Sequence, residues 1–446
     1  MVKQKQLISD LDLTFNVHSR KNITITLLTL LLLGLLVNRA QSQEQNKSVV
    51  SHIEFKGQKT NNLQYLHDLL HFDIGTSVDK AQLGRALQNL KNAPGIAFVT
   101  ETIDTLSDRI QVLYHLEERR TLLPIVNFGG VKGNIWYRLG ITDNNWRGKG
   151  HTLLAYYQNN DKRHSGELYF RNPRYLNGNW GHAFSLNKWS SVEPLFFNEG
   201  TVQYLYDNNS IAGSIIRNFG RRRFLEFGMT YFVENYKQAA EQFLENPPGP
   251  EELTEKKWLA KLIFNQNFLN YHFFYLKGYD FSAIFQKVFN TSDKSLFNSL
   301  QLQTRFFLRP SHKINLAARF KFGISTNNDS PFAPFVVDSH INIRGVGNRI
   351  DRGTAQLIFN AEVRYTMYHK QKWAAQAIAF SDLGSWRDPG GNINQLFDKN
   401  QFRQFVGLGF RVIYQKVFGA TLRVDYGVDV LNPKERGLVV GLGQYF

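Results

Sequence analysis

The chain from Thr354 to Tyr368 alternates between apolar and polar side chains. Seven apolar residues occupy every second position, and the residues between them are polar apart from Ile358. Successive side chains of a β-strand point to opposite faces, so this pattern predicts a strand with one apolar and one polar face. A second strand is expected from Trp373 to Trp386.

Similar alternating runs recur to the end of the chain, separated by short breaks rich in Asn, Gly and Pro. Examples are Glu167–Arg171, Leu300–Phe306, Ile314–Phe322 and Leu422–Asp429. We count about sixteen such strands, an even number, as bacterial single-chain barrels have. The fold class expected is therefore mainly β, with a transmembrane antiparallel β-barrel over residues 121–446. A soluble β-sandwich is the alternative.

A smaller domain is expected before the barrel, at residues 48–118. A strand that ends at Gly57 is followed by two leucine patterns at helical spacing and then by two more strands. The order β-α-α-β-β predicts a small α+β domain.

The N-terminal residues 1–42 have the pattern of a secretory signal peptide. Arg20 and Lys21 precede an apolar run from Ile23 to Val37, which leads to Ala40-Gln41-Ser42. A basic flank, a short apolar run and small residues at the exit define such a signal. An uncleaved anchor is the alternative. Export favours the outer membrane as the location, with the small domain in the periplasm.

Composition supports a barrel more than a nucleic-acid-binding protein. Aromatic residues make up 14% of the chain and charged residues 20%, a mixture typical of strands that face lipid and water in turn. The net charge of +16 could attract nucleic acid. However, basic residues such as Arg319, Lys321 and Arg364 fall on the polar face of predicted strands, so no nucleic-acid partner is expected.

Enzymatic and metal-dependent functions find no support in the sequence. The chain has no Cys, so disulfides, thiol nucleophiles and Cys-based metal sites are excluded. Phosphate-loop, HExxH and GxSxG patterns are missing, and the twelve His residues are scattered. We therefore expect no enzyme, no catalytic residue, no metal and no cofactor.

The strongest candidate site is Arg344-Gly345, in a polar, Gly-rich segment before the alternating strand. A guanidinium in a partly dry lumen requires carboxylates, and bidentate pairing suits it best. Glu362 and Asp382 lie on the polar faces of the two following strands. We expect Arg344 to anchor an inward-folded loop on these carboxylates, either as part of a mechanism or only as a brace.

Four motifs, which occur along the chain in the family's order, resemble the BamA superfamily of outer-membrane assembly and secretion proteins. They are Arg344-Gly345, the strand motif from Asn360 through Glu362 and Arg364, the motif from Phe380 through Asp382 to Gly384, and the Gly140–Gly150 hairpin. Residues 48–118 resemble a POTRA domain, including Gly57 and Glu117 at strand ends. The family usually has an aromatic residue after Arg-Gly, where this chain has Val346, and often Gly-Gly where Ser339-His340 stand.

The last ten residues resemble the β-signal that the outer-membrane assembly machinery reads. Leu438, Val440 and Leu442 are expected to share a face with Phe446. The glycines of this strand add no side-chain packing, so the seam between the first and last strands should be weak. These glycines are Gly437, Gly441 and Gly443.

The resemblance implies a protein that inserts or folds β-barrel clients into the outer membrane. The POTRA domain would capture an unfolded client, and the seam would then open for it. Membrane lipid and unfolded barrel clients are the expected partners, with periplasmic chaperones or lipoproteins besides. An export pore of the two-partner-secretion type and a passive channel are the alternatives. The pore type usually carries a plug helix.

Strand parity gives a prediction for two connections. If the first strand starts on the side of the POTRA domain, Asn144–Gly150 should face outward. The proline-containing connection Lys237–Glu255 should then face the periplasm.

Overall fold

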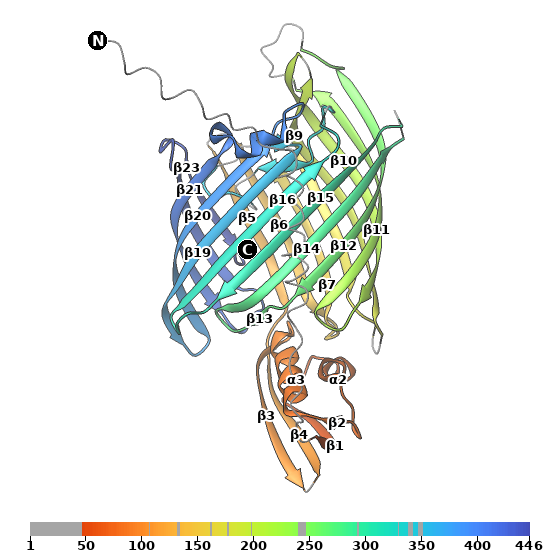
Figure 1. Cartoon of the computed structure of the whole chain (residues 1–446), viewed down its shortest axis with the longest axis vertical. Coiled ribbons are helices and arrows are strands. Elements are labelled where there is room, and N and C mark those ends of the chain that lie inside the picture. The colour runs from red at the N-terminus through yellow and green to blue at the C-terminus, as the bar shows by residue number, and fades with distance from the viewer. Residues whose placement is uncertain are drawn as a thin grey trace, which may run out of the picture. The chain divides into compact units, whose positions relative to one another are not determined.

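The computed structural model of the chain places residues 48–446 in one compact unit (Figure 1). The described residues are 47–106, 108–131, 134–160, 163–175, 178–197, 199–239, 247–291, 294–328, 330–337, 342–346 and 351–446. The predicted signal peptide, residues 1–42, lies outside the described residues.

Sixteen long strands form a closed barrel in the described part of the chain, as the alternating pattern predicts. The first eight are β5 (Leu122–Val131), β6 (Asn134–Trp146), β7 (His151–Asn160), β8 (Arg163–Asn172), β9 (Trp180–Phe197), β10 (Gly200–Asn218), β11 (Arg223–Gln238) and β12 (Glu252–Asn267). The others are β14 (Leu276–Asn290), β15 (Leu296–Leu308), β16 (Ile314–Ser325), β19 (Ala355–Lys370), β20 (Trp373–Arg387), β21 (Arg403–Tyr414), β22 (Thr421–Asp429) and β23 (Arg436–Leu442).

The strands follow one another around the barrel in chain order, each antiparallel to the next, and β23 lies next to β5. The two-residue β13 (Asn270–Tyr271) pairs with the start of β14. Two short strands, β17 (Phe335–Val337) and β18 (Asp351–Gly353), pair within the connection between β16 and β19. We call the described parts of this connection, residues 326–328, 330–337, 342–346 and 351–354, the lumenal loop.

Alternation along each strand separates a lipid-type surface from a polar interior. On β19, Val363, Tyr365 and Met367 are 43–58% exposed, whereas Asn360 and Glu362 are at most 3% exposed. A transmembrane barrel has this arrangement, because its outer face meets lipid and its inner face meets a polar lumen.

Among the helices that the structure describes, none combines the length and apolar character needed to cross a bilayer.

The strands β9 to β12 are 16–19 residues long, more than the roughly 9–11 that a tilted membrane strand requires. Their two-faced pattern inverts near one end. At the start of β10, Val202 and Tyr204 are fully buried, and Thr201 and Gln203 are exposed. The inward side chains here form an apolar cluster that includes Leu195, Val202, Tyr204 and Tyr236.

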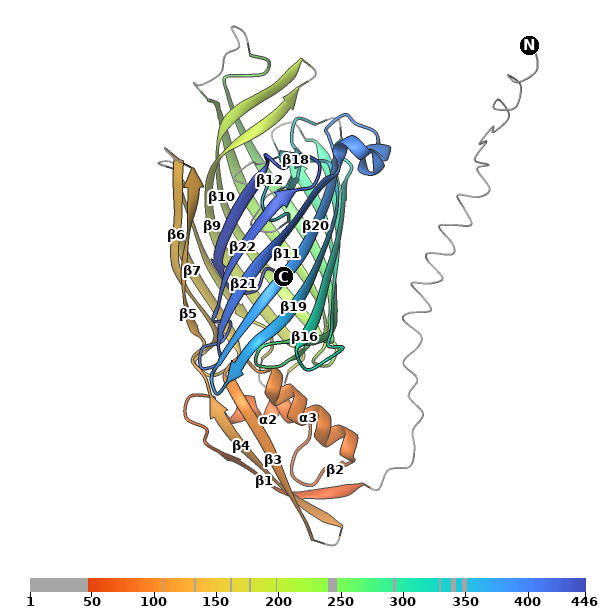
Figure 2. The same cartoon turned by 90° about the vertical axis from the view of Figure 1, so that its left-hand side faces the viewer.

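The α+β domain (residues 48–118, orange in Figure 1) packs two helices on a four-stranded sheet of order β2-β1-β4-β3. Its elements are β1 (Ser48–Lys56), α2 (Leu63–Leu70), β2 (Ser77–Val78), α3 (Lys80–Asn92), β3 (Ile96–Leu106) and β4 (Arg109–Glu118). Asn62 and Asp79 cap the two helices through their side chains, as polar N-cap residues commonly do. The strand β3 is an edge strand of this sheet (Figure 2).

Glu118, and not the predicted Glu117, closes the last strand of this domain. Its carboxylate accepts hydrogen bonds from the backbone amides of Lys59, Thr60 and Asn61 at 2.8–3.1 Å. Burial raises the pKa of Glu118, but the bonds from Thr60 and Asn61 outweigh it and lower the pKa below its usual value. Glu117 instead pairs with Lys416 of the barrel.

The connection Asn144–Gly150 lies on the side of the α+β domain, so the prediction that it faces outward is wrong. The Gly148 carbonyl accepts from the Asn62 amide at 3.0 Å, and the Asn145 side chain donates to Asn61 at 2.8 Å. A Cβ on Gly148 would meet the Thr60 carbonyl at 2.1 Å, so only glycine permits this approach. The strand count used for this prediction began one strand late, because the glycine-containing β5 has a poor alternation of apolar and polar residues. The connection after Lys237 therefore lies at the other end of the barrel.

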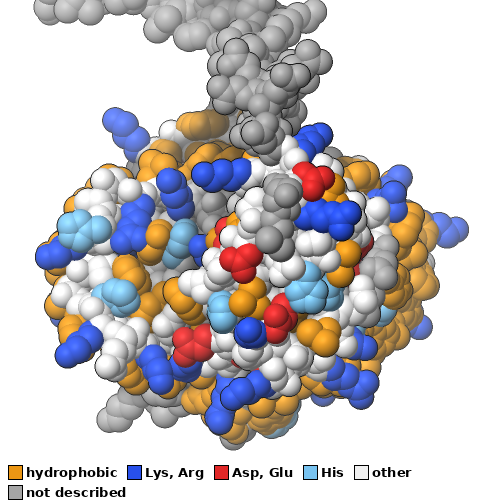
Figure 3. All heavy atoms as spheres, turned by 90° about the horizontal axis from the view of Figure 1, so that it is seen from below, with side chains coloured by type: hydrophobic (Ala, Val, Ile, Leu, Met, Phe, Trp, Pro, Cys, Tyr) orange, Lys and Arg blue, Asp and Glu red, His pale blue; other side chains and the backbone are white. Residues whose placement is uncertain are grey.

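Lys and Arg side chains predominate over Asp and Glu on the face seen from below, where they lie mainly around the rim (Figure 3). Part of the basic excess behind the net charge of +16 therefore lies on this surface and not in the lumen.

Replacing Glu118 with Gln should loosen the 59–61 segment, because an amide is a weaker acceptor than a carboxylate. Hydrogen exchange at the amides of Lys59, Thr60 and Asn61 in the full-length protein should accelerate about tenfold. The lowered pKa means that this stabilisation is complete above the unfolded pKa of about 4.3 and fades as the pH falls further. Glu117→Gln is the control, and equal exchange in both variants would contradict the assignment.

Candidate functional site

Arg344 is fully buried inside the barrel and bonds to both carboxylates expected from the sequence. Its backbone N and its Nε donate to Asp382 Oδ2 at 2.9 and 2.8 Å, and Nη2 donates to Asp382 Oδ1 at 2.8 Å. Its Nη1 donates to Glu362 Oε1 at 2.5 Å. The bonds to Asp382 form the bidentate arrangement in which an arginine is held most firmly.

The strand register brings the two motif carboxylates together. Asn360 lies directly opposite Asp382 on the paired strands β19 and β20, and Glu362 follows two residues later on the same inward face. The Asn360 side chain donates to Asp382 Oδ1 and to the Asn342 carbonyl, both at 2.8 Å. Arg364, two residues further along, donates to Glu362 Oε2 at 2.6 Å. Each motif residue on β19 therefore orients the site.

The two remaining motif residues on β20 make contact with the loop. The Arg344 guanidinium lies 3.7 Å from the centre of the Phe380 ring, a cation–π distance. A Cβ on Gly384 would meet Ile343 Cδ1 at 2.3 Å, so the glycine makes room for the fully buried Ile343. Val346, where an aromatic residue is usual, packs on the apolar cluster that Ile343 forms with Trp386 and Phe405.

Three glycines form a row on the barrel wall, and two of them, Gly427 and Gly437, face the loop backbone. Gly407, Gly427 and Gly437 face one another across β21, β22 and β23. A Cβ on Gly427 would meet the Arg344 carbonyl at 2.5 Å, and one on Gly437 would meet the Gly345 carbonyl at 2.8 Å. Gly437 was predicted to thin the seam. In the structure it also admits the loop next to the last strand.

The last residues of the chain differ from the sequence-based expectation. The strand β23 ends at Leu442, and Gly443 has a positive φ of 92°. Tyr445 and Phe446 are each 7% exposed and lie inside the barrel, so the prediction that Phe446 shares a face with the exposed Leu438 is wrong. Alternation alone could not show this, because the turn depends on lumenal contacts far away in sequence.

Arginine side chains surround this inward tail. The Phe446 carbonyl accepts from Arg364 Nη2 at 3.2 Å, and the Arg319 guanidinium lies 5.0 Å from the Phe446 ring. Arg344 and Arg423 lie 4.3 and 5.0 Å from the Tyr445 ring. Gly441, the third predicted seam glycine, leaves space for Arg423, since a Cβ there would come within 3.1 Å of its Nε.

Sequence reasoning missed two charged members of the site. Asp425 lies 3.8 Å from Arg344 Nη1 and holds Arg411 at 2.6 Å, and both residues are fully buried. The signal was available, since an acidic side chain on the polar face of the Leu422–Asp429 strand must point into the lumen. In the part of the chain that the structure describes, no group of His, Asp and Glu side chains could hold a metal ion.

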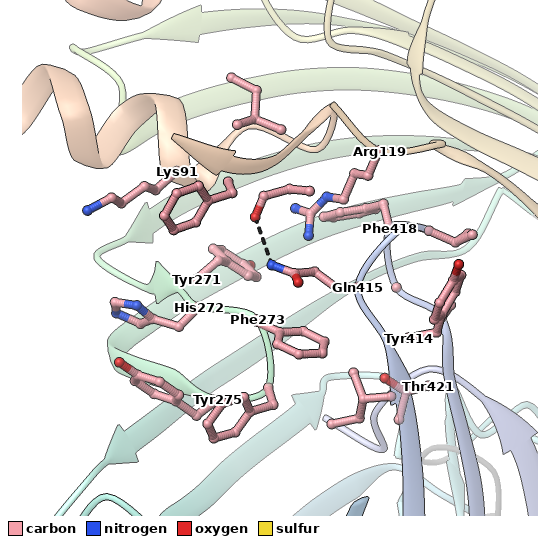
Figure 4. Close-up of a pocket in the computed structure, with 18 of the residues that line it drawn as sticks. Lys91, Arg119, Tyr271, His272, Phe273, Tyr275, Tyr414, Gln415, Phe418 and Thr421 are labelled. Atoms are coloured by element: carbon pink, nitrogen blue, oxygen red, sulfur yellow. Dashed lines mark hydrogen bonds between the residues drawn. The ribbon is translucent and has the colours of Figure 1, made fainter. Parts of the chain in front are cut away.

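A cavity of about 720 Å³ opens beside the tail, between the α+β domain and the barrel (Figure 4). Tyr271, Phe273 and Phe418 border it together with the cationic side chains of Lys91 and Arg119 (Figure 4). Gln415 crosses this space to donate to the Ala97 carbonyl of β3 at 3.1 Å, the bond drawn in Figure 4.

Comparison with known proteins supports this fold. No family model matches the sequence, and no curated protein matches it. Among solved structures, BamA from Haemophilus ducreyi lacking POTRA domains 1–3 is 14% identical with a TM-score of 0.51, over 89% of this chain and 83% of that one. CdiB from Acinetobacter baumannii is 16% identical with a TM-score of 0.56, over 90% of this chain and 74% of that one. CdiB from Escherichia coli is 9% identical with a TM-score of 0.60, over 90% of this chain and 77% of that one.

These similarities and the strand count identify the architecture. The chain has the fold seen in BamA and CdiB, a sixteen-stranded antiparallel barrel preceded by a small α+β domain. At 9–16% identity, the similarity concerns the fold alone.

Arg344→Ala should destabilise the barrel, because it leaves Glu362 and Asp382 buried without their partner. Breaking a buried ion pair in this way costs about 3–5 kcal/mol. The midpoint of denaturant unfolding in lipid vesicles should fall accordingly. Arg344→Lys keeps the charge but loses the bidentate geometry, so its unfolding midpoint should lie between those of the unchanged protein and Arg344→Ala. Unchanged unfolding of Arg344→Ala would contradict the assignment.

Gly437→Ala should displace the loop backbone, since its methyl group would meet the Gly345 carbonyl. We expect the Arg344 amide, which donates to Asp382, to lose at least about tenfold of its protection from hydrogen exchange. Gly213→Ala is the matched control, because a Cβ there meets no atom within 4 Å. Equal protection in both variants would show that the loop does not depend on Gly437.

Proposed function

We propose that this protein resides in the outer membrane, with its α+β domain in the periplasm, and assembles β-barrel clients there. The client would add its strands at the seam between β5 and β23 after capture by the α+β domain. Unfolded barrel proteins and membrane lipid are the partners on this proposal, with periplasmic chaperones or lipoproteins as additional ones. The chemistry is strand pairing, and no covalent step is needed.

The observation that carries this proposal is the seam. The strand β23 has 7 residues, the fewest of the sixteen, and its neighbour β5 has 10. Among the described neighbouring pairs of long strands, β23 and β5 make the least extensive contact. Unsatisfied backbone groups are costly within a bilayer, and a strand edge readily accepts another strand. A client strand could therefore replace this contact at little cost.

The edge strand β3 supports the capture step. It offers one open side of the α+β sheet, and an extended peptide can join such an edge through backbone hydrogen bonds. The aromatic and cationic cavity shown in Figure 4 lies along the residues Ile96 to Val99 of this strand.

The lumenal loop argues against a passive channel. It contacts the wall at β19 and β20 through Arg344 and the wall at β9 through Arg352. A segment that touches both walls narrows the free lumen, so a constitutive open pore is a poor fit.

Export of a partner protein through the lumen is the second candidate. The barrel resembles CdiB at TM-scores of 0.56 and 0.60, at least as well as it resembles BamA at 0.51. Export would require the loop to leave the lumen, whereas insertion would require the seam to open. The two functions therefore make opposite demands on the barrel.

Cross-linking the seam separates these functions. Cysteine is absent from the chain, so pairs introduced at Val126 on β5 and at Leu438 or Val440 on β23 are the only thiols. A disulfide between β5 and β23 should abolish insertion of a barrel client into vesicles that contain the protein. Leu408 and Tyr426 face each other on β21 and β22, and a cysteine pair there is the control.

Unimpaired client insertion through a cross-linked seam would overturn the proposed function. A second variant would carry a disulfide that holds the loop in the lumen and leaves the seam free. Loss of protein export in that variant would instead favour the secretion pore.

A further inference from the structure

The lumenal loop has a second attachment, on the wall away from Arg344. Arg352 of β18 forms an ion pair with Glu193 of β9, and its Nη1 also donates to the Ala333 carbonyl at 3.3 Å. Glu193 is 4% exposed and accepts a further hydrogen bond from the Ser191 hydroxyl at 2.6 Å. Arg352 thus ties both arms of the loop to β9. The strand β18 lies near the upper end of the barrel in Figure 2.

An aromatic contact reinforces this attachment. Phe332 of the loop packs against the apolar cluster at the inverted ends of β9, β10 and β11. Lys257 Nζ lies 4.0 Å from the centre of the Phe332 ring and is itself paired with Glu234 at 2.5 Å. The cation therefore has a carboxylate on one side and an aromatic ring on the other.

The two attachments lie on opposite walls. Around the closed barrel, seven of the described long strands separate β9 from β20 in either direction. The loop is bonded to β9 by Arg352 and to β20 by Arg344, so it spans the lumen along its full width. One of the two arcs between these strands contains the seam of β23 and β5.

The two attachments differ in strength. The Arg344, Glu362 and Asp382 side chains are 0% exposed, whereas the Arg352 and Glu193 side chains are 21% and 5% exposed. A cavity of about 180 Å³ adjoins Arg352 and Glu193, so this pair is not packed on every side. Partly hydrated ion pairs are weaker than fully buried, bidentate ones. The Arg352 end is therefore the one that separates first.

We infer that the lumenal loop is a cross-brace between two opposite walls, and that Arg352–Glu193 is its releasable end. While both ends hold, the brace fixes the distance between β9 and β20 and opposes widening of the arc that contains the seam. Separation of Arg352 from Glu193 frees the part of the loop near Arg352 and Ala333, while Arg344 keeps its own part of the loop bound to β19 and β20. Arg352 is thus a positioning residue that acts through the loop. The step from loop release to seam opening rests on the proposed function, and the brace itself does not.

A thiol in the loop reports its release. Ala333→Cys introduces the only cysteine of the chain, at a position 5% exposed beside the Arg352 pair. In the full-length protein in lipid vesicles, a maleimide should label this thiol slowly. Adding Arg352→Ala or Glu193→Gln should raise the labelling rate at least about tenfold, since each removes a charge-assisted contact. Single-channel conductance, measured in planar bilayers, should rise in the same variants.

The matched control is another lumenal ion pair. Arg171 and Glu226 join β8 and β11 with side chains 20% and 4% exposed, nearly the same burial as Arg352 and Glu193. Their hydrogen bonds and ion pair involve no described residue of the loop. Arg171→Ala should leave the labelling rate and the conductance unchanged. The charge-reversed double variant Arg352→Glu with Glu193→Arg should restore slow labelling, which a general loss of packing would not allow.

The results separate the brace from the proposed function. Equal labelling rates in Arg352→Ala, Glu193→Gln and Arg171→Ala would overturn the brace, whatever the insertion assay shows. Faster labelling together with faster disulfide loss at the seam supports the complete inference. Faster labelling in a protein that inserts no client leaves the brace in place and rejects the proposed function. If Arg352→Ala fails to fold, the isosteric Glu193→Gln decides the matter.

Discussion

The barrel is organised around the buried guanidinium of Arg344. Three carboxylates, those of Glu362, Asp382 and Asp425, lie 2.5–3.8 Å from its nitrogen atoms. All four side chains are 0% exposed, so their charged groups are withdrawn from water. Such a group is tolerated only when its partners are in place, because an unpaired charge in this setting costs several kcal/mol. The loop and the wall therefore fix each other's positions.

This constraint connects the lumen to the edge of the barrel. The backbone at Arg344 and Gly345 rests on the glycine row that ends at Gly437 of β23, the strand that borders the seam. The tail beyond β23 turns back toward the same guanidinium through Tyr445. The short last strand, the inward tail and the loop thus form one continuous set of contacts. A movement of β23 would therefore displace the loop backbone and alter the contacts of the Arg344 guanidinium.

Much of this architecture follows from the sequence by simple physics. Alternation interrupted only at Ile358 predicted β19, and a second strand was expected at β20. Glu362 and Asp382 were placed inside because polar side chains of a membrane strand face the lumen. Arg344 could be paired with them since a buried guanidinium needs carboxylates. These inferences require only local periodicity and charge. The weak alternation of β5 shows where the method fails, because one missed strand reversed every connection.

The other errors arise where long-range packing overrides a local pattern. Phe446 continues the period-two pattern of β23, yet its contacts with Phe307 and Arg364 lie inside the barrel. The role of Gly437 as a resting surface for Gly345 could not be read from its own strand, and neither could the pairing of Arg352 with Glu193, 159 positions apart. Sequence periodicity reports which face a side chain occupies, but not which distant residue it meets there.

The inversion along β10 marks where the hydrocarbon must end. After Asp207, the outward positions of β10 carry Ile211 and Ile215. At the start of the strand they carry Thr201 and Gln203, then Leu205, while Val202 and Tyr204 face inward. The inverted end of the long strands β9 to β12 therefore has the pattern of a water-soluble sheet, and the rest of these strands has the pattern of a membrane-embedded one. Their polar outer flank is thus the part of the barrel's outer surface that suits contact with water and not with lipid.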